Sequence, residues 1–171
     1  MSETEAGRNW YAVCVRSRFE FKIEKNLSKK GIEIFLPAVK VRRRWTDRNK
    51  LVIFPLFPGY LFVNIDKNSA ERKTVIGAHG VVRYVCMSPG VPEPIAEDQI
   101  MSLKKAAEND ISLESYPAIK EGNRVRIKSG PLAGIEGMMV KKEKNSLLVL
   151  SVDILQKGAA LKIDASEVER V

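Results

Sequence analysis

The chain has 171 residues, which is enough for one or two small domains with modest cores. Lys and Arg outnumber Asp and Glu by 29 to 21, and the resulting net charge of +8 makes a polyanionic partner plausible. One histidine and two isolated cysteines, Cys14 and Cys86, provide no nucleophile–base pair and no metal-ligand spacing, so we expect no enzyme, no cofactor and no metal site.

Targeting signals are also missing from the sequence. A membrane span needs about 18 consecutive apolar residues, and no such run occurs. The first residues, MSETEAGRN, are polar where a secretory signal would need an apolar segment. We therefore expect a cytoplasmic protein without a membrane partner, and we expect it to be a monomer.

The first elements follow a polar leader, which we expect to be disordered over residues 1–8. The alternation of WYAVCVRS at 10–17 predicts a strand. Ser17 and Glu20 have the spacing of a capping box, and apolar residues then recur every four positions, so a helix is predicted to start there and to stop at Gly31.

A hairpin and a central strand are predicted next. After the short strand IEIFLP, the segments AVKVRRRW and KLVIFPLF flank a turn signal at residues 46–49. GYLFVNID at 59–66 has the strongest strand pattern. A short helical or irregular piece ending at Gly77 and Gly80, the strand VVRYVCM and a helix within IAEDQIMSLKKAAEND complete the segment.

These patterns predict two domains. Residues 9–109 read as an α+β domain whose helices cover a mainly antiparallel sheet. Residues 110–118 lack a firm periodicity and are predicted to be a linker. Residues 119–171 contain five short strands separated by turn residues, which is typical of a small all-β, SH3-like barrel.

Three motifs resemble the NusG family of transcription elongation factors: WYAV at 10–13, LFPGYLFV at 56–63 and EGNRVRIKSGPLAGIEGMM at 121–139. The resemblance covers nearly the whole chain. It implies an N-terminal NGN domain that binds RNA polymerase and a C-terminal KOW barrel that recruits other partners. The KOW turn would contain Gly130, Pro131, Gly134 and Gly137.

In the family, an apolar depression on the NGN domain binds the clamp helices of the largest subunit of bacterial RNA polymerase. By position, the residues that would line or support it are Tyr11, Cys14, Phe57, Pro58, Tyr60 and Phe62. Strand alternation must turn some of these inward, so core packing remains the alternative for each aromatic residue. Members of the RfaH type also contact the polymerase gate loop through His-Thr-Thr, where this chain has Glu71, Arg72 and Lys73.

The predicted hairpin concentrates positive charge. Six basic residues stand against Asp47 between residues 40 and 50, giving 6 − 1 = +5. Guanidinium groups suit phosphate, and a tryptophan can stack on a base, so the hairpin is a candidate nucleic-acid site. The candidates are Arg42, Arg43, Arg44, Trp45, Arg48 and Lys50. A solvated hairpin kept charged against aggregation is the alternative.

Such an Arg-rich hairpin is similar to that of specialised NusG paralogues of the RfaH and UpxY types, which serve long polysaccharide operons. This resemblance implies binding of the single-stranded non-template DNA, with nascent RNA as a further candidate ligand. The matching residues would be Arg16, Arg18, Lys22, His79 and Arg83. An ordinary loop histidine is the alternative for His79.

The barrel departs from the housekeeping pattern, because ILQKGAALKI at 154–163 replaces Phe-Gly-Arg-x-Thr-Pro. Ribosomal protein uS10 remains a candidate partner, whereas coupling to termination factor Rho is in doubt. The sequence thus predicts a specialised factor that suppresses pausing or termination. A housekeeping NusG-like factor and a KOW-containing RNA-binding or ribosome-associated protein, using Arg124, Arg126 and Lys128, are the alternatives.

Overall fold

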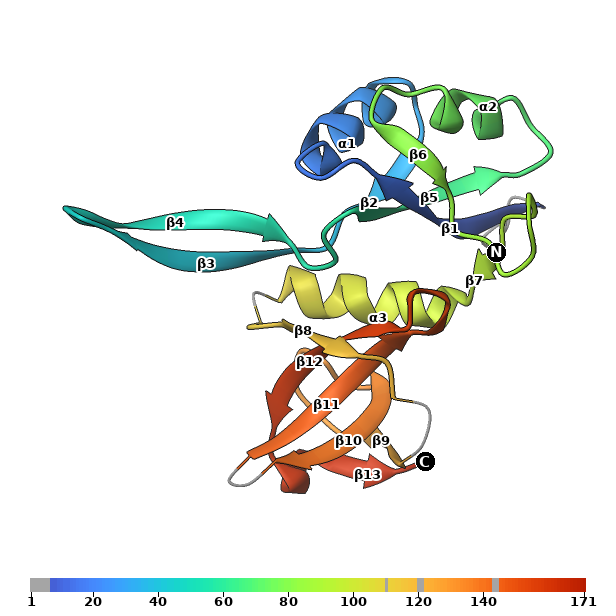
Figure 1. Cartoon of the computed structure of the whole chain (residues 1–171). Coiled ribbons are helices and arrows are strands. Elements are labelled where there is room, and N and C mark those ends of the chain that lie inside the picture. Colours follow the sequence, from blue (N-terminus) through green and yellow to red (C-terminus); the bar gives the residue numbers. More distant parts are fainter. Residues whose placement is uncertain (1–6, 110, 120–121, 143–144) are drawn as a thin grey trace. The chain divides into compact units, whose positions relative to one another are not determined.

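A computed structural model of the chain describes residues 7–109, 111–119, 122–142 and 145–171 (Figure 1). Most of the predicted leader, residues 1–6, lies outside the described residues, and the first strand already begins at Arg8. Contacts within the chain divide it into two compact units, Met1–Leu36 with Phe57–Ile100 and Pro37–Leu56 with Met101–Val171. No helix in the described part of the chain is long and apolar enough to cross a membrane.

The first unit is built on an antiparallel sheet with the strand order β2-β5-β1-β6. Its strands are β1 (Arg8–Val15), β2 (Glu33–Phe35), β5 (Tyr60–Asp66) and β6 (Val81–Tyr84), with β7 (Pro94–Ile95) also paired to β1. Helices α1 (Glu20–Lys29) and α2 (Glu71–Ile76) lie on one side of this sheet (Figure 1). Helix α3 (Glu97–Glu108) follows β7 and begins in this unit. The predicted α+β fold is confirmed.

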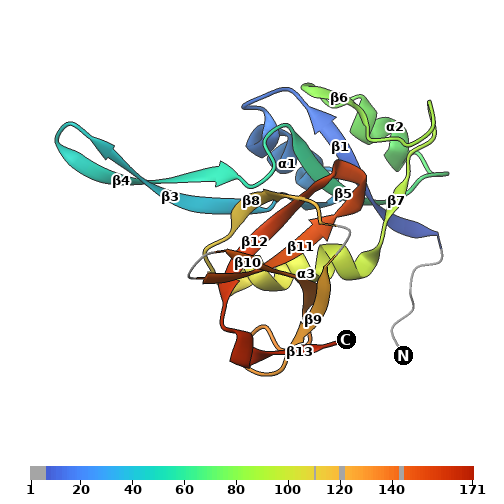
Figure 2. The ribbon, with the colours of Figure 1, turned by 60° about the horizontal axis from the view of Figure 1, so that its bottom comes forward.

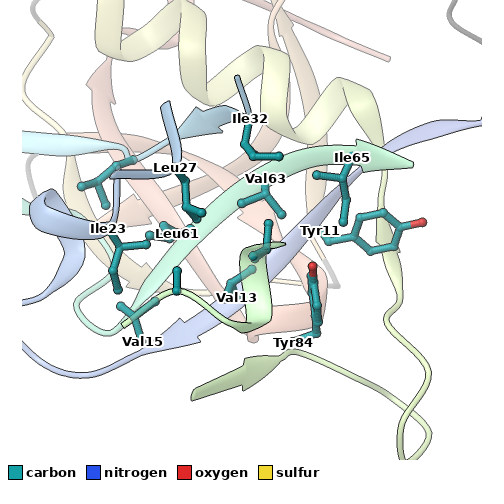
Figure 3. Packing of buried hydrophobic residues seen from close by; sticks show 13 residues of the cluster. Tyr11, Val13, Val15, Ile23, Leu27, Ile32, Leu61, Val63, Ile65 and Tyr84 are labelled. Carbon is teal, nitrogen blue, oxygen red and sulfur yellow. The ribbon is translucent and has the colours of Figure 1, made fainter. Parts of the chain in front are cut away.

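The core of this unit lies between the sheet and α1 with α2 (Figure 3). Alternate residues of β5 turn toward the helices because side chains in a strand alternate between faces, so Leu61 and Val63 pack with Ile23 and Leu27 of α1. Val75 of α2 belongs to the same cluster. The other alternate residues of β1 and β5 therefore form a second face, which carries the predicted binding residues.

Helix α1 ends as predicted but starts differently. Gly31 follows the helix in the left-handed conformation, with φ 80°. The predicted capping box is wrong, because Phe19 is the N-cap residue and no side chain caps the helix. Arg18 has φ 69°, and the N–H of Phe19 donates to the Arg16 carbonyl, so a turn separates Ser17 from the helix start.

The predicted hairpin is confirmed as a two-stranded sheet of its own, formed by β3 (Ala38–Trp45) and β4 (Arg48–Pro55). The connection is tighter than the predicted turn, since Trp45 already pairs with Arg48 and only Thr46 and Asp47 join the strands. Every residue from 40 to 51 is exposed.

The second unit contains a small all-β barrel with the strand order β13-β9-β10-β11-β12-β8. The five predicted strands are β9 (Asn123–Ile127), β10 (Glu136–Lys142), β11 (Asn145–Val152), β12 (Lys157–Ile163) and β13 (Val168–Arg170). Gly130 and Gly134 of the predicted KOW turn have positive φ, and Pro131 is exposed in the same turn. At Gly137 a Cβ would lie 2.7 Å from the Val149 carbonyl, so no larger residue fits between these strands.

A sixth strand, β8 (Glu114–Pro117), corrects the linker prediction. It pairs antiparallel with β12, beside which it lies in both views (Figures 1 and 2). Tyr116 packs against the buried cluster that includes Leu147 and Val149. This pairing depends on a distant strand edge and therefore leaves no local pattern. Residue 110 of the predicted linker and residues 120–121 of the predicted barrel lie outside the described residues.

Candidate functional site

The FPGY segment forms a tight turn that leads into β5. The N–H of Tyr60 donates to the Phe57 carbonyl at 3.1 Å, and Pro58 and Gly59 occupy the two central positions. Gly59 has φ 84°, which is the conformation that a type II turn requires at its third residue, while proline favours the second. The two turn residues thus fix the direction in which the following strand leaves.

A buried carboxylate holds this turn in place. The N–H of Gly59 donates to Oε1 of Glu20 at 3.0 Å, and the Gly59 carbonyl accepts from the N–H of Val15 at 2.9 Å. Glu20 is only 3% exposed. Sequence reasoning missed this role, although one signal was present: Glu20 shares its helical face with Ile23 and Leu27, where an acid is unexpected.

Three of the residues predicted to form the depression lie on the second face of the sheet. Cys14 and Tyr60 are direct partners in the β1–β5 ladder and both are half-buried. Phe62 lies on the same face but is fully buried, and its ring contacts those of Phe35 and Phe57 at centroid distances of 6.0 and 6.2 Å, so it supports this face and does not line its surface. We call Cys14, Tyr60 and Phe62 the sheet-face cluster.

Three of the predicted depression residues have other positions. Tyr11 turns to the opposite face, where its ring meets Tyr84 edge-on at 6.3 Å within the core (Figure 3). It therefore cannot line the depression, and this part of the prediction is corrected. Phe57 is buried and packs beneath the turn, whereas Pro58 is exposed at its tip.

Two of the residues predicted to contact nucleic acid near α1, Lys22 and His79, lie beside one aromatic ring. His79 meets the Phe19 ring edge-on at 5.4 Å, and Nζ of Lys22 lies 5.3 Å from the same ring. Gly80 allows this approach, since a Cβ there would lie 2.6 Å from the Phe19 ring. Its carbonyl accepts from the N–H of Arg16 at 2.8 Å.

Arg16, Arg18, Lys22 and His79 are all exposed, and we call them the α1 cluster. Arg83 does not join it. In the β1–β6 ladder Arg83 is the partner of Cys14, and its side chain lines a groove together with Arg72 and Lys73.

The three predicted gate-loop residues also differ in their surroundings. Glu71 is half-buried, forms an ion pair with Arg8 at 2.6 Å and accepts from the N–H of Asp66 at 3.2 Å. It thus anchors the start of α2. Arg72 donates to the Gly90 carbonyl at 3.2 Å, while Lys73 is exposed.

The hairpin presents its charge on two faces, because cross-strand partners share a face and successive residues alternate. Arg43 with Lys50 and Trp45 with Arg48 are partners on one face. There the guanidinium of Arg43 lies 4.5 Å from the Phe54 ring centroid. The other face carries Lys40, Arg42 and Arg44, opposite Ile53, Leu51 and Asn49 respectively.

The barrel offers a weaker basic surface than its sequence predicted. Arg124 and Arg126 both pair with Glu136, the first at 2.9 Å. These arginines lower the pKa of the Glu136 carboxyl. The carboxylate offsets part of the positive charge that an RNA-binding barrel would need. Leu155 is buried and Ile154 is half-buried, so the segment that replaces the housekeeping motif offers little apolar surface.

No group of three or more His, Cys, Asp or Glu among the residues that the structure describes could hold a metal ion.

An α+β domain with a rigid FPGY turn, followed along the chain by a small barrel with a glycine-containing turn, defines a protein of the NGN–KOW class.

Comparison with protein families assigns the chain within this class. The family model described as "Transcription termination factor nusG" matches residues 8–104, and the chain belongs to the NusG family. Among curated relatives, a protein of Borreliella burgdorferi named "Transcription termination/antitermination protein NusG" is 27% identical, covering 96% of this chain and 99% of that protein. A protein of the same name from Staphylococcus carnosus is 26% identical over the full length of both chains.

A solved structure has the same fold. It is described as "Domain interaction in Thermotoga maritima NusG" and aligns with a TM-score of 0.53 at 23% sequence identity, covering 96% of this chain and 97% of that one.

Proposed function

We propose that this protein is a transcription elongation and antitermination factor that binds the clamp helices of bacterial RNA polymerase through the sheet-face cluster and suppresses pausing or termination. One observation carries the proposal: the turn Phe57–Tyr60, anchored on the buried Glu20, holds Tyr60 beside Cys14 on a fixed sheet face. A rigid apolar face of this kind suits a helix tip, because side chains that are already ordered lose little entropy on binding.

The proposed mechanism involves no catalysis. A factor that binds the active conformation of polymerase more tightly than the paused one shifts the population toward the active state. A difference of about 1.4 kcal/mol in binding free energy would change pause occupancy about tenfold. Lys73, and Arg72 to a smaller degree, are the candidates for a second contact at the gate loop.

A specialised, operon-specific role is the finer part of the proposal. The hairpin carries +5, with basic residues on both faces, and the α1 cluster adds further cations beside an aromatic ring. These two surfaces suit the phosphates and bases of the single-stranded non-template DNA, and nascent RNA is a second candidate ligand. The barrel would recruit a further partner such as ribosomal protein uS10, while the replaced motif argues against tight Rho coupling.

In vitro transcription with the cognate polymerase tests the proposal. Elongation through a long template and a terminator is compared with and without the protein, on its own operon leader and on an unrelated leader. Longer transcripts on the cognate leader alone would support a specialised antiterminator. Equal effects on both would favour a housekeeping factor, and no effect on either would favour an RNA-binding or ribosome-associated protein.

A further inference from the structure

An amphipathic groove in the first unit does not include the hairpin and borders the sheet-face cluster only at Arg83, the partner of Cys14. It has a volume of about 610 Å³ and lies between α2 and the turn that follows β6. This volume is within the range of sites that enclose a small ligand or a few side chains, about 300–1,000 Å³. The groove is therefore large enough to bind part of a peptide.

Apolar side chains form much of the groove, and several of them are exposed. Met87 is 74% exposed and Ile76 is 41% exposed, although both are large hydrophobic residues. Pro89 and Pro92 contribute rigid apolar surface beside them. Exposed apolar groups that gather at one concave site indicate an interaction surface rather than ordinary scatter.

The charged groups of the groove all have one sign. Arg72, Lys73 and Arg83 line it, and none of the other lining residues is acidic. Two acids adjoin lining residues in the sequence: Glu71 is already paired with Arg8, and Glu93 is exposed but is not among the residues that line the groove. A ligand that complements this lining carries carboxylates that pair with the three cations. It also carries one or two large apolar side chains that pack against the apolar residues of the groove.

The groove is held open by internal hydrogen bonds. The guanidinium of Arg72 donates to the Gly90 carbonyl at 3.2 Å, and the hydroxyl of Tyr84 donates to the Arg72 carbonyl at 3.1 Å. These bonds tie α2 to β6 and to the turn that forms the opposite wall. Binding therefore requires little rearrangement of the backbone.

We infer that this groove is a docking site for a short acidic segment of a partner protein that carries large apolar side chains. The apolar floor favours a peptide over nucleic acid, whose phosphates would gain nothing from Met87 or Ile76. The inference goes beyond the proposed function: it shares Arg72 and Lys73 with the predicted gate-loop contact but requires neither the clamp helices nor DNA.

The test is selection of short random linear peptides, displayed on phage, against the full-length protein. We expect the enriched sequences to combine Asp or Glu with large apolar residues. The affinity of a synthetic enriched peptide, measured by fluorescence anisotropy, should fall at least about tenfold for Met87→Asp and for the pair Lys73→Glu with Arg83→Glu. Met101→Asp and Lys67→Glu change an exposed methionine and lysine outside the groove and should leave the affinity unchanged.

Two further measurements locate the bound peptide and separate the alternatives. Cys86 lines the groove, so bound peptide should slow its alkylation in the wild-type protein but not in the Met87→Asp protein. The inference is overturned if no acidic, apolar peptide is enriched, if the groove variants bind it normally, or if only a single-stranded oligonucleotide binds and protects Cys86. Binding of the Met87→Asp protein to isolated clamp helices should be unchanged, which keeps this result separate from the proposed function.

Discussion

The sheet-face region and the hairpin use opposite means to present binding groups. At the sheet face a buried carboxylate, a type II turn and packed rings fix Tyr60 in position. On the hairpin every residue from 40 to 51 is exposed, and the two strands pair only with each other. Binding the tip of a helix requires a protein surface of defined shape, whereas binding a phosphate backbone requires mainly positive charge. We therefore expect substitutions at the sheet face to change the free energy of unfolding. Substitutions on the hairpin should instead change the salt dependence of nucleic-acid binding.

Phe62→Ala should have the largest effect on stability. Its ring is fully buried and contacts two other aromatic rings, so we expect a loss of about 3–5 kcal/mol in the free energy of unfolding. Urea unfolding followed by Trp10 fluorescence in a Trp45→Phe background reports on the first unit. A loss below about 1 kcal/mol would mean that the cluster is not packed as described. This variant is therefore unsuitable as a clean test of binding.

Glu20→Ala should have the next largest effect. The substitution leaves the N–H of Gly59 without its acceptor in a partly buried position, which costs about 1–3 kcal/mol. Glu24→Ala is the matched control, because it removes a half-buried carboxylate from the same helix and leaves the hydrogen bond between Gly59 and Glu20 in place. Equal effects of the two substitutions in the same unfolding assay would argue against the anchoring role of Glu20.

Tyr84 provides a pH-dependent test of the core. Burial raises its pKa from 10.0 to about 12, so the unfolded state loses the phenolic proton at lower pH than the folded state. Its contribution to stability is therefore complete below pH 10 and is lost as the pH rises toward 12. Tyr84→Phe should cost about 1 kcal/mol at neutral pH, because its hydrogen bond to Arg72 is removed, but should flatten this alkaline decline. Unfolding midpoints measured across this range would contradict the account if both proteins declined equally.

Neutralising the hairpin should affect stability least. Replacing Arg42, Arg43 and Arg44 with Gln should change the free energy of unfolding by no more than about 0.5 kcal/mol each. In contrast, the log-log slope of single-stranded DNA binding against salt should fall by about 0.7 for each phosphate group that the variant no longer neutralises. Replacing Lys128, Lys141 and Lys162 of the barrel removes the same charge and should leave the slope unchanged. A slope that responds equally to both sets would make the hairpin only a solvated surface.

The sequence predicted features that depend on neighbouring residues. The strand β5, the end of α1 at Gly31, the paired hairpin strands and the barrel strands all follow from local alternation or turn residues. The two-domain fold class follows from their order, and the FPGYLFV motif indicated the family by its resemblance alone.

Features that depend on distant residues were missed. Glu20 and Gly59 are 39 positions apart, so their hydrogen bond has no local signature. Strand β8 forms because it pairs with the edge of β12, and Arg83 lies opposite Cys14 because of the register between β6 and β1. Tyr11 was assigned to the depression because the resemblance gave its position along β1 but not the face to which it turns.

The most direct test of the central claim is the affinity of the full-length protein for an isolated clamp-helix fragment of bacterial RNA polymerase, compared between wild type and Tyr60→Ala. Tyr60 is half-buried, so its removal should leave the first unit folded, as checked by urea unfolding. We predict a loss of affinity of at least about tenfold, because an aromatic side chain buried against a partner contributes about 1.5–3 kcal/mol. Unchanged affinity in a folded Tyr60→Ala protein would contradict the proposal that this sheet face binds the polymerase.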